Sequence, residues 1–233
     1  GSDGLGYQLA QALGHSITER IFPALVPLNL PKSHFLCELK GITLPATLEL
    51  WSGRQKRLNS FTNSTLLTHF GLSGPAVLDM SRYYLAAHAD DAAVTLTINW
   101  LPALSADQFE QGLLGLGKKQ PISLLRQYVP ERMARALVAE AGIVDGQMSR
   151  EQRKGLVRLA TRYPLPISGN RGYNYAEVTA GGVPLTEIHL KTMESRLCPN
   201  LFFAGEICDV DGRIGGFNFQ WAWSSGYVAG VSC

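Results

Sequence analysis

The spacing of hydrophobic residues changes along the chain, and this change limits the folds that the sequence can adopt. Residues 33–104 contain stretches in which apolar and polar residues alternate, as in residues 94–100, the pattern of a strand with one buried face. Residues 105–162 instead carry apolar residues at every third or fourth position, which predicts three or four short helices. We therefore expect a small antiparallel sheet or barrel followed by a helical part.

Local signals predict where several elements begin. Residues 105–108 and 149–152 both have the capping-box pattern, in which a Ser oxygen and a Gln side chain satisfy exposed amides at a helix start. The segment Gly71-Leu-Ser-Gly-Pro75 lacks the spacing of a nucleophile elbow, and we interpret it as a turn that enters a helix.

The first 31 residues predict one helix and then an extended segment. Residues 3–14 fit a short helix with Asp3 at its N-cap and with Leu5, Leu9 and Ala12 on one face. Three prolines in residues 20–31 exclude a helix there, and this segment is a plausible domain boundary.

Composition narrows the class of protein. The 24 glycines and 12 prolines favour a β-containing fold, and 45% hydrophobic residues are enough for a sizeable core. No apolar run approaches the roughly 18 residues of a membrane helix, and no signal-peptide pattern is visible. The four cysteines and five histidines show no metal-ligand spacing. We expect a cytoplasmic protein without a bound metal or a membrane partner.

Charge is unevenly distributed. The net charge is only +2, but residues 118–162 hold ten Lys and Arg against four acidic residues. Such a basic stretch can bind phosphate groups, but we favour an ordinary solvated helix face because no aromatic residues interleave the charges.

The last 33 residues carry the most specific pattern. Residues 201–204 form a short apolar run typical of a buried parallel strand, and Gly205-Glu206 follows it directly. A loop containing Asp209, Asp211 and Arg213 then leads to Gly215-Gly216 and a long apolar, aromatic segment that predicts a helix. Two glycines at a helix start leave amides open to a ligand, and the helix dipole favours negative charge there.

This segment resembles the carboxyl-terminal FAD motif of two-dinucleotide-binding-fold flavoproteins, and most closely the bacterial aminoacetone oxidase-like, BaiN/RdsA-type NAD(P)/FAD-dependent oxidoreductases. The resemblance extends over most of the chain, through the segments DGLGYQLAQALGH, PALVPL, LLTHFGLSGPAVLDMS, AEVTAGGV, TMES and GEICDVDGRIGGFNFQWAWSSG.

The resemblance implies an α/β fold (α+β for these residues alone) in which a partial Rossmann-type FAD domain is interrupted by an insertion. We expect residues 1–24 and 164–233 to belong to the FAD domain. Residues 25–104 would form an antiparallel β-barrel-like part of the insertion, and residues 105–163 its helical part.

The resemblance also implies a cofactor site. Glu206 would bond a ribityl hydroxyl of FAD, and Gly215, Gly216, Phe217 and Asn218 would lie against the isoalloxazine. The remaining expected cofactor residues are Gly205, Asp209 and Gln220. Arg213, Asp211 and Cys208 are candidates for a catalytic role, whereas Trp221 and Trp223 are expected in the core.

One family feature is missing. The family's flavin domain begins with a strand and GxGxxG, and this sequence contains neither. We therefore expect the carboxyl-terminal portion of a flavoprotein, which alone would hold FAD poorly and be inactive.

The parent protein would be an FAD-dependent oxidoreductase, reduced by NADH or NADPH, that acts on an unsaturated small molecule or on uridine in ribosomal RNA. The alternative is a non-catalytic module whose basic helices bind RNA or another partner. The sequence leaves the oligomeric state open.

Overall fold

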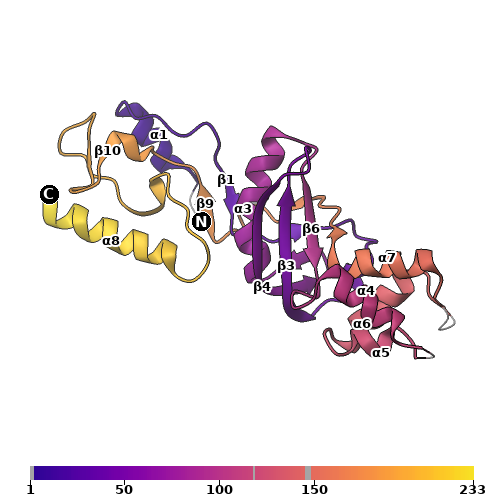
Figure 1. Ribbon diagram of the computed structural model, residues 1–233. Coiled ribbons are helices and arrows are strands. Elements are labelled where there is room, and N and C mark those ends of the chain that lie inside the picture. Colours follow the sequence, from indigo (N-terminus) through magenta and orange to yellow (C-terminus); the bar gives the residue numbers. More distant parts are fainter. Residues whose placement is uncertain (1–2, 118, 145–147) are drawn as a thin grey trace. The chain divides into compact units, whose positions relative to one another are not determined.

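The computed structural model describes residues 3–117, 119–144 and 148–233, which form two compact units (Figure 1). Unit 1 combines the N-terminal segment up to Val26 with Arg171–Cys233, and unit 2 comprises Pro27–Asn170. Unit 2 is therefore inserted into unit 1. The division into four segments made from the sequence stays a prediction.

Unit 2 is built on one antiparallel sheet. Its seven strands lie in the order β7-β6-β3-β4-β5-β2-β8, and every neighbouring pair is antiparallel. Their bounds are β2 (Leu28–Asn29), β3 (Thr43–Trp51), β4 (Arg57–Thr68), β5 (Gly71–Ser73), β6 (Thr95–Asn99), β7 (Tyr163–Pro164) and β8 (Gly169–Asn170). The mixed α/β class is confirmed, with this sheet as its β-rich part.

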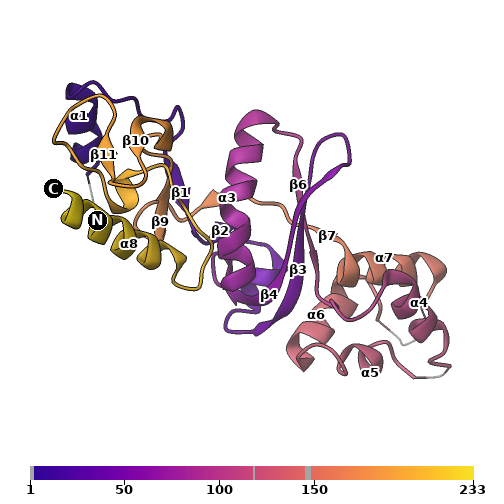
Figure 2. The ribbon, with the colours of Figure 1, turned by 60° about the vertical axis from the view of Figure 1, so that its left-hand side comes forward.

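The alternation of residues explains how the sheet is covered. Leu48 and Leu50 of β3 face the same side as Leu96 and Ile98 of β6, and all four are at most 1% exposed. Helix α3 (Pro75–Asp90) packs against β3 and β4 (Figure 2). It begins at Gly74 with Pro75 in its first turn, so the predicted turn into a helix is confirmed.

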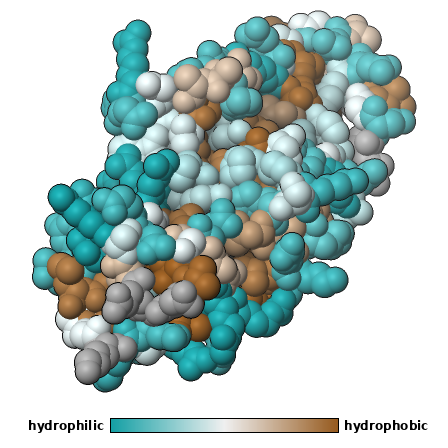
Figure 3. Space-filling view, turned by 90° about the vertical axis from the view of Figure 1, so that its right-hand side faces the viewer, coloured by the Kyte–Doolittle hydropathy of each residue, from teal (hydrophilic) through white to brown (hydrophobic). Residues whose placement is uncertain are grey.

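The predicted helical part contains four helices among the described residues. These are α4 (Ala106–Leu114), α5 (Ile122–Leu125), α6 (Glu131–Glu140) and α7 (Arg150–Thr161); a further short helix, α2 (Phe35–Glu38), precedes the long strands. Both predicted capping boxes are present, at the starts of α4 and α7. Figure 3 looks onto the end of unit 2 formed by these helices, where hydrophilic side chains surround separate hydrophobic areas. Lys118 and Asp145 of the basic stretch lie outside the described residues.

Unit 1 contains little regular sheet. Strand β1 (Phe22–Ala24) pairs with β9 (Val178–Ala180), and β10 (Ile188–His189) pairs with β11 (Glu194–Ser195), both antiparallel. Its helices are α1 (Leu5–Ala12), two short 3-10 turns, η1 (Leu185–Glu187) and η2 (Gly205–Ile207), and α8 (Phe217–Ser232). Both long helices were predicted from the sequence and are confirmed. The N-cap of α1 is Gly4, however, and not the predicted Asp3, whose Oδ1 accepts from the Leu5 amide.

The predicted strand at residues 201–204 is wrong. Phe202 makes only an isolated antiparallel bridge with Glu194, because the described part of unit 1 offers this segment no parallel neighbour along its length.

Burial in the two long helices of unit 1 does not follow their apolar residues. The face of α1 that carries Leu5 and Leu9 is exposed, at 53% and 58%, and Ala10 is the residue that α1 buries. Trp223, expected in the core, is 68% exposed. In both helices a different set of positions packs on unit 1.

Candidate functional site

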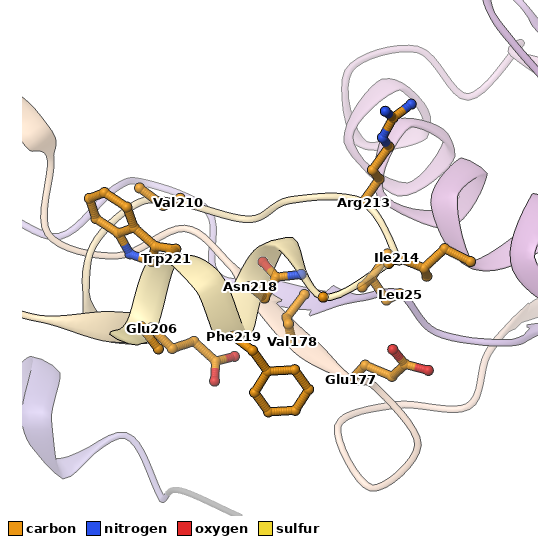
Figure 4. Close-up of a pocket in the computed structure, with 13 residues that line it drawn as sticks. Leu25, Glu177, Val178, Glu206, Val210, Arg213, Ile214, Asn218, Phe219 and Trp221 are labelled. Atoms are coloured by element: carbon orange, nitrogen blue, oxygen red, sulfur yellow. The ribbon is translucent and has the colours of Figure 1, made fainter. Parts of the chain in front are cut away.

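Unit 1 contains a cavity of about 470 Å³ at the start of α8 (Figure 4). Its walls come from four segments: the end of β1, the start of β9, η2 with the loop after it, and the first turns of α8. The lining residues are Leu25, Glu177, Val178, Glu206, Val210, Arg213, Ile214, Gly215, Gly216, Asn218, Phe219, Trp221 and Ala222.

The pairing of β1 with β9 brings the distant ends of the chain together. Ala24 lies opposite Val178, and the Glu177 amide donates to the Leu25 carbonyl at 3.3 Å. Leu25 itself has a φ of 49°, a left-handed backbone angle that is uncommon for a residue with a side chain. Its strained backbone is held in place at the cavity wall, where its side chain is 3% exposed.

Glu206, for which the sequence predicted a ribityl contact, lines this cavity. It lies in η2, and its Oε1 accepts a hydrogen bond from the Thr179 amide, which fixes the side chain at the cavity. Figure 4 shows its carboxylate directed toward the side of Phe219. One carboxylate oxygen is therefore engaged by β9, and the other is available to a ligand.

The glycine pair forms an open helix start. Gly215 and Gly216 have φ values of 112° and 87°, which favour glycine, and Gly216 is the N-cap of α8. A Cβ built on Gly216 would meet no atom within 4 Å, and no described side chain caps the helix. The first amides of α8 and its positive dipole end are thus accessible from the cavity.

Side chains of α8 form hydrogen bonds with the preceding segment, residues 205–212, and hold it at the start of the helix. The Asn218 amide group accepts from the Gly212 N–H at 2.7 Å and donates to the Gly212 carbonyl at 2.9 Å. Trp221 Nε1 donates to the Gly205 carbonyl at 2.9 Å, and the Gly205 amide donates to Ser225 Oγ at the same distance. The cavity is therefore held in shape before any ligand arrives.

Five predicted site residues line this cavity: Glu206, Gly215, Gly216, Asn218 and the catalytic candidate Arg213. The Arg213 guanidinium lies over the Phe217 ring at 5.2 Å and points away from the other labelled side chains in Figure 4. Phe217 is 50% exposed and lies beside the cavity without lining it.

The other predicted residues surround the cavity at a greater distance. Gly205 supports Trp221, and the Asp209 amide donates to the Val183 carbonyl at 2.8 Å. The Gln220 side chain donates to Ser224 Oγ. Neither these residues nor Asp211 line the cavity.

Cys208 is the least accessible candidate. It is 0% exposed in the core of unit 1, and burial raises the pKa of its thiol to about 11. Its thiol is therefore protonated at neutral pH.

The sequence did not predict the cavity walls that come from residues outside the segment 201–233. Leu25, Glu177 and Val178 lie within the quoted segments PALVPL and AEVTAGGV, which were the only signal for them. Phe219 and Trp221 line the cavity from α8.

A second cavity, of about 590 Å³, shares Glu177, Val178 and Glu206 with the first. Tyr7 of α1 and Tyr173 add aromatic walls. Burial raises the pKa of Tyr7, and the negative charges of Glu206 and Asp209 add to this effect. The Tyr7 phenol is therefore protonated at neutral pH.

Among the described residues, no group of three His, Cys, Asp or Glu side chains could hold a metal ion. Across the same residues, no helix combines the length and the apolar character that crossing a membrane requires.

Comparison with known proteins decides the family. Residues 1–232 match the HI0933-like protein Rossmann domain. The chain belongs to this family. The resemblance inferred from the tail and the upstream segments is thereby confirmed.

Named relatives cover the whole chain. A ribosomal RNA dihydrouridine synthase of Haemophilus influenzae is 35% identical over all of this chain, and one of Escherichia coli is 33% identical over 98% of it. A 3-dehydro-bile acid delta(4,6)-reductase of Clostridium scindens is 31% identical over 99%. The chain spans 56% to 58% of the length of these relatives. The family is therefore one of Rossmann-domain oxidoreductases.

Proposed function

We propose that the chain forms part of an FAD-dependent oxidoreductase in which the cavity at the start of α8 receives the isoalloxazine. The observation that carries this proposal is the meeting of Glu206 with the open Gly215-Gly216 helix start in one cavity. The relatives' names, a dihydrouridine synthase and a bile acid reductase, support redox chemistry at carbon–carbon double bonds.

The residues fit this cofactor in shape and in chemistry. A flat ring needs a surface without side chains, which the two glycines give, and apolar walls, which Val178, Phe219 and Trp221 give. The first amides of α8 suit the polar edge of the ring, where negative charge develops on reduction. The ribityl chain carries hydroxyls, for which the free oxygen of Glu206 is an acceptor.

The protein's part in the reaction follows from these contacts. When bound, FAD supplies hydride transfer, with NADH or NADPH as its source of electrons. The α8 dipole stabilises negative charge at the cavity, Glu206 positions the cofactor, and the apolar walls exclude water. The substrate is an unsaturated compound, either a small molecule or uridine in ribosomal RNA.

A cofactor titration tests the proposal. The protein is purified in the longest form that its reading frame encodes and titrated with FAD by visible absorbance and flavin fluorescence. Gly216→Val should weaken FAD binding at least about tenfold, because the added side chain covers the open amides and the left-handed φ disfavours valine. Gly155→Val, in the open middle of α7, is the matched control.

A second, more conservative variant distinguishes the loss of a cofactor contact from misfolding. Glu206→Gln keeps the shape of the side chain and should raise the Kd for FAD several-fold, whereas the exposed Glu19→Gln should not. A colourless protein that does not take up FAD would overturn the proposal, as would equal FAD affinity in all four variants.

A second function is favoured by the surface of α7. Arg150, Lys154 and Arg158 recur every four residues and are exposed, so they form one basic stripe, the α7 stripe. Arg153 is not part of it, because its Nε donates to Glu110 Oε1 at 3.0 Å. We propose that the α7 stripe contacts phosphates of an RNA substrate or partner.

A further inference from the structure

Arg162 follows the α7 stripe at the same spacing of four residues, and its guanidinium lies over an aromatic ring. The distance from Arg162 Cζ to the centroid of the Trp51 ring is 4.3 Å. Arg162 is the C-cap of α7, and its amide donates to the Arg158 carbonyl at 2.9 Å, so the helix continues to this point. A polymer that runs along the α7 stripe would therefore meet the Trp51–Arg162 pair one helical turn after Arg158.

Trp51 is held on the face of the sheet that Leu48 and Leu50 leave open. It ends β3, where successive side chains point to opposite faces, and it is half-buried. Its Nε1 donates to Thr97 Oγ1 on the adjacent strand β6 at 3.2 Å. This hydrogen bond and the cation–π contact with Arg162 order both groups before any partner binds.

The cations near this pair are available to an anionic partner. Arg162 and the three residues of the α7 stripe are exposed, and within the described parts of the chain none of the four forms an ion pair. Glu49, which shares the open face of β3 with Trp51, is engaged by Arg57 Nη1 at 2.8 Å. The surface thus joins unpaired positive charges to a stacked aromatic–guanidinium pair.

This combination is the one that the basic stretch lacks in its own sequence. No aromatic residue interleaves its charges, but the fold brings Trp51 to its end from a distant strand. In Figure 2, α7 leads into β7, which pairs with β6 of the same sheet. Cations that follow a phosphate backbone, beside flat groups on which bases stack, are typical of sites for single-stranded nucleic acid.

We propose that Trp51 and Arg162 form a base-stacking site for single-stranded RNA. An unpaired base stacks on the outer face of the Arg162 guanidinium, while phosphates of neighbouring nucleotides contact the α7 stripe. Arg162 touches the base, and Trp51 is a positioning residue that holds the guanidinium in place. The proposal rests on the RNA contact proposed above for the α7 stripe and adds that bases are bound as well as phosphates.

An abasic oligonucleotide separates these two contributions. The protein, in the longest form that its reading frame encodes, is titrated by fluorescence anisotropy with labelled oligouridylate and with an abasic oligoribonucleotide of equal length. The two strands carry the same phosphates, so the ratio of their Kd values measures the binding of bases. The wild-type protein should prefer oligouridylate at least about fivefold.

Two variants locate the stacking site. Arg162→Lys keeps the charge and loses the planar group, and Trp51→Leu keeps an apolar contact and releases the guanidinium. Both should abolish the preference for oligouridylate and leave the Kd for the abasic strand unchanged. Trp223→Leu, which changes a 68% exposed tryptophan of unit 1, is the matched control and should keep the preference.

The failures of the two proposals are distinguishable. Equal Kd values of the wild-type protein for both strands would overturn base stacking and leave the phosphate contacts of the α7 stripe standing. No binding of either strand would overturn both proposals. A preference that survives in Arg162→Lys would place the bases elsewhere and overturn this site, and this variant decides alone if circular dichroism shows that Trp51→Leu is unfolded.

Discussion

His15 Nε2 lies 2.7 Å from Ser195 Oγ, although 180 residues separate the two in sequence. Both residues are buried, and His15 Nδ1 contacts Glu187 Oε2 at 2.8 Å. The arrangement has the order of a hydrolytic triad, but Ser195 Oγ also accepts from the amides of Leu197 and Cys198, so its hydrogen-bonding capacity is filled. These residues tie the segment after α1 to β11.

Removing the imidazole should therefore destabilise unit 1. His15→Ala removes the imidazole partner of the buried Ser195 hydroxyl and one of the partners of the Glu187 carboxylate, a loss of about 1–3 kcal/mol. Urea denaturation followed by circular dichroism measures the change. The exposed His189→Ala is the control, and equal midpoints for the two variants would contradict the role of His15.

The same cluster predicts a dependence of stability on pH. Burial raises the pKa of Glu187, but hydrogen bonds from Ser16 and His15 outweigh it and hold the pKa below its usual value. A carboxyl whose pKa is lower in the folded state stabilises the fold above its unfolded pKa of about 4.3 and loses this contribution as pH falls through the folded value. Urea midpoints between pH 7 and the acid limit should fall less steeply for Glu187→Gln. Parallel pH curves would refute this.

The cysteines should differ in reactivity. Burial raises the pKa of Cys208 to about 11 and shields it, whereas Cys233 is exposed. In the folded protein at pH 8, iodoacetamide should modify Cys233 and leave Cys208 unmodified, as measured by peptide mass spectrometry. In urea both should react. Rapid modification of Cys208 in the folded protein would contradict this expectation and would favour a redox role for its thiol.

Two glycines of unit 2 should respond oppositely to the same change. A Cβ on Gly71 would lie 2.4 Å from the Leu28 carbonyl oxygen, and its φ of 143° is strained for alanine, so Gly71→Ala should cost about 1–3 kcal/mol or more. Gly155, inside α7, has no atom within 4 Å of a built Cβ, and Gly155→Ala should add about 1 kcal/mol. Thermal and urea unfolding of both variants measure the difference.

The α7 stripe predicts salt-dependent RNA binding. Reversal of Arg150, Lys154 and Arg158 to Glu should weaken binding of a ribosomal RNA fragment and reduce the slope of log K against log salt by about 2–3. The control reverses the exposed Lys32, Lys40 and Lys56, which gives the same net charge elsewhere on unit 2. If both triple variants bind alike, the α7 stripe is not the contact.

Elements defined by neighbouring residues were predictable from the sequence. The Ser and Gln of each capping box are three residues apart, and the alternation in β6 needs only its own residues. The start of α8 was likewise fixed by the adjacent Gly215 and Gly216.

Features that depend on distant partners were not predictable. The burial of α1 at Ala10 in place of Leu5 depends on what packs against the helix, and an apolar run such as residues 201–204 becomes a strand only beside another strand. Leu25 reaches the cavity because β1 pairs with β9, and no local pattern encodes that pairing.

The chain passes from unit 1 into unit 2 and back again, and the positions of these two passages bear on how the family can vary. Leu28 pairs with Asn170, so the chain enters and leaves unit 2 through adjacent antiparallel strands. A turn of a few residues can join these strands, so the whole of unit 2 is exchangeable without breaking unit 1. Such an exchange would leave the cavity at the start of α8 intact, because all of its lining residues belong to unit 1.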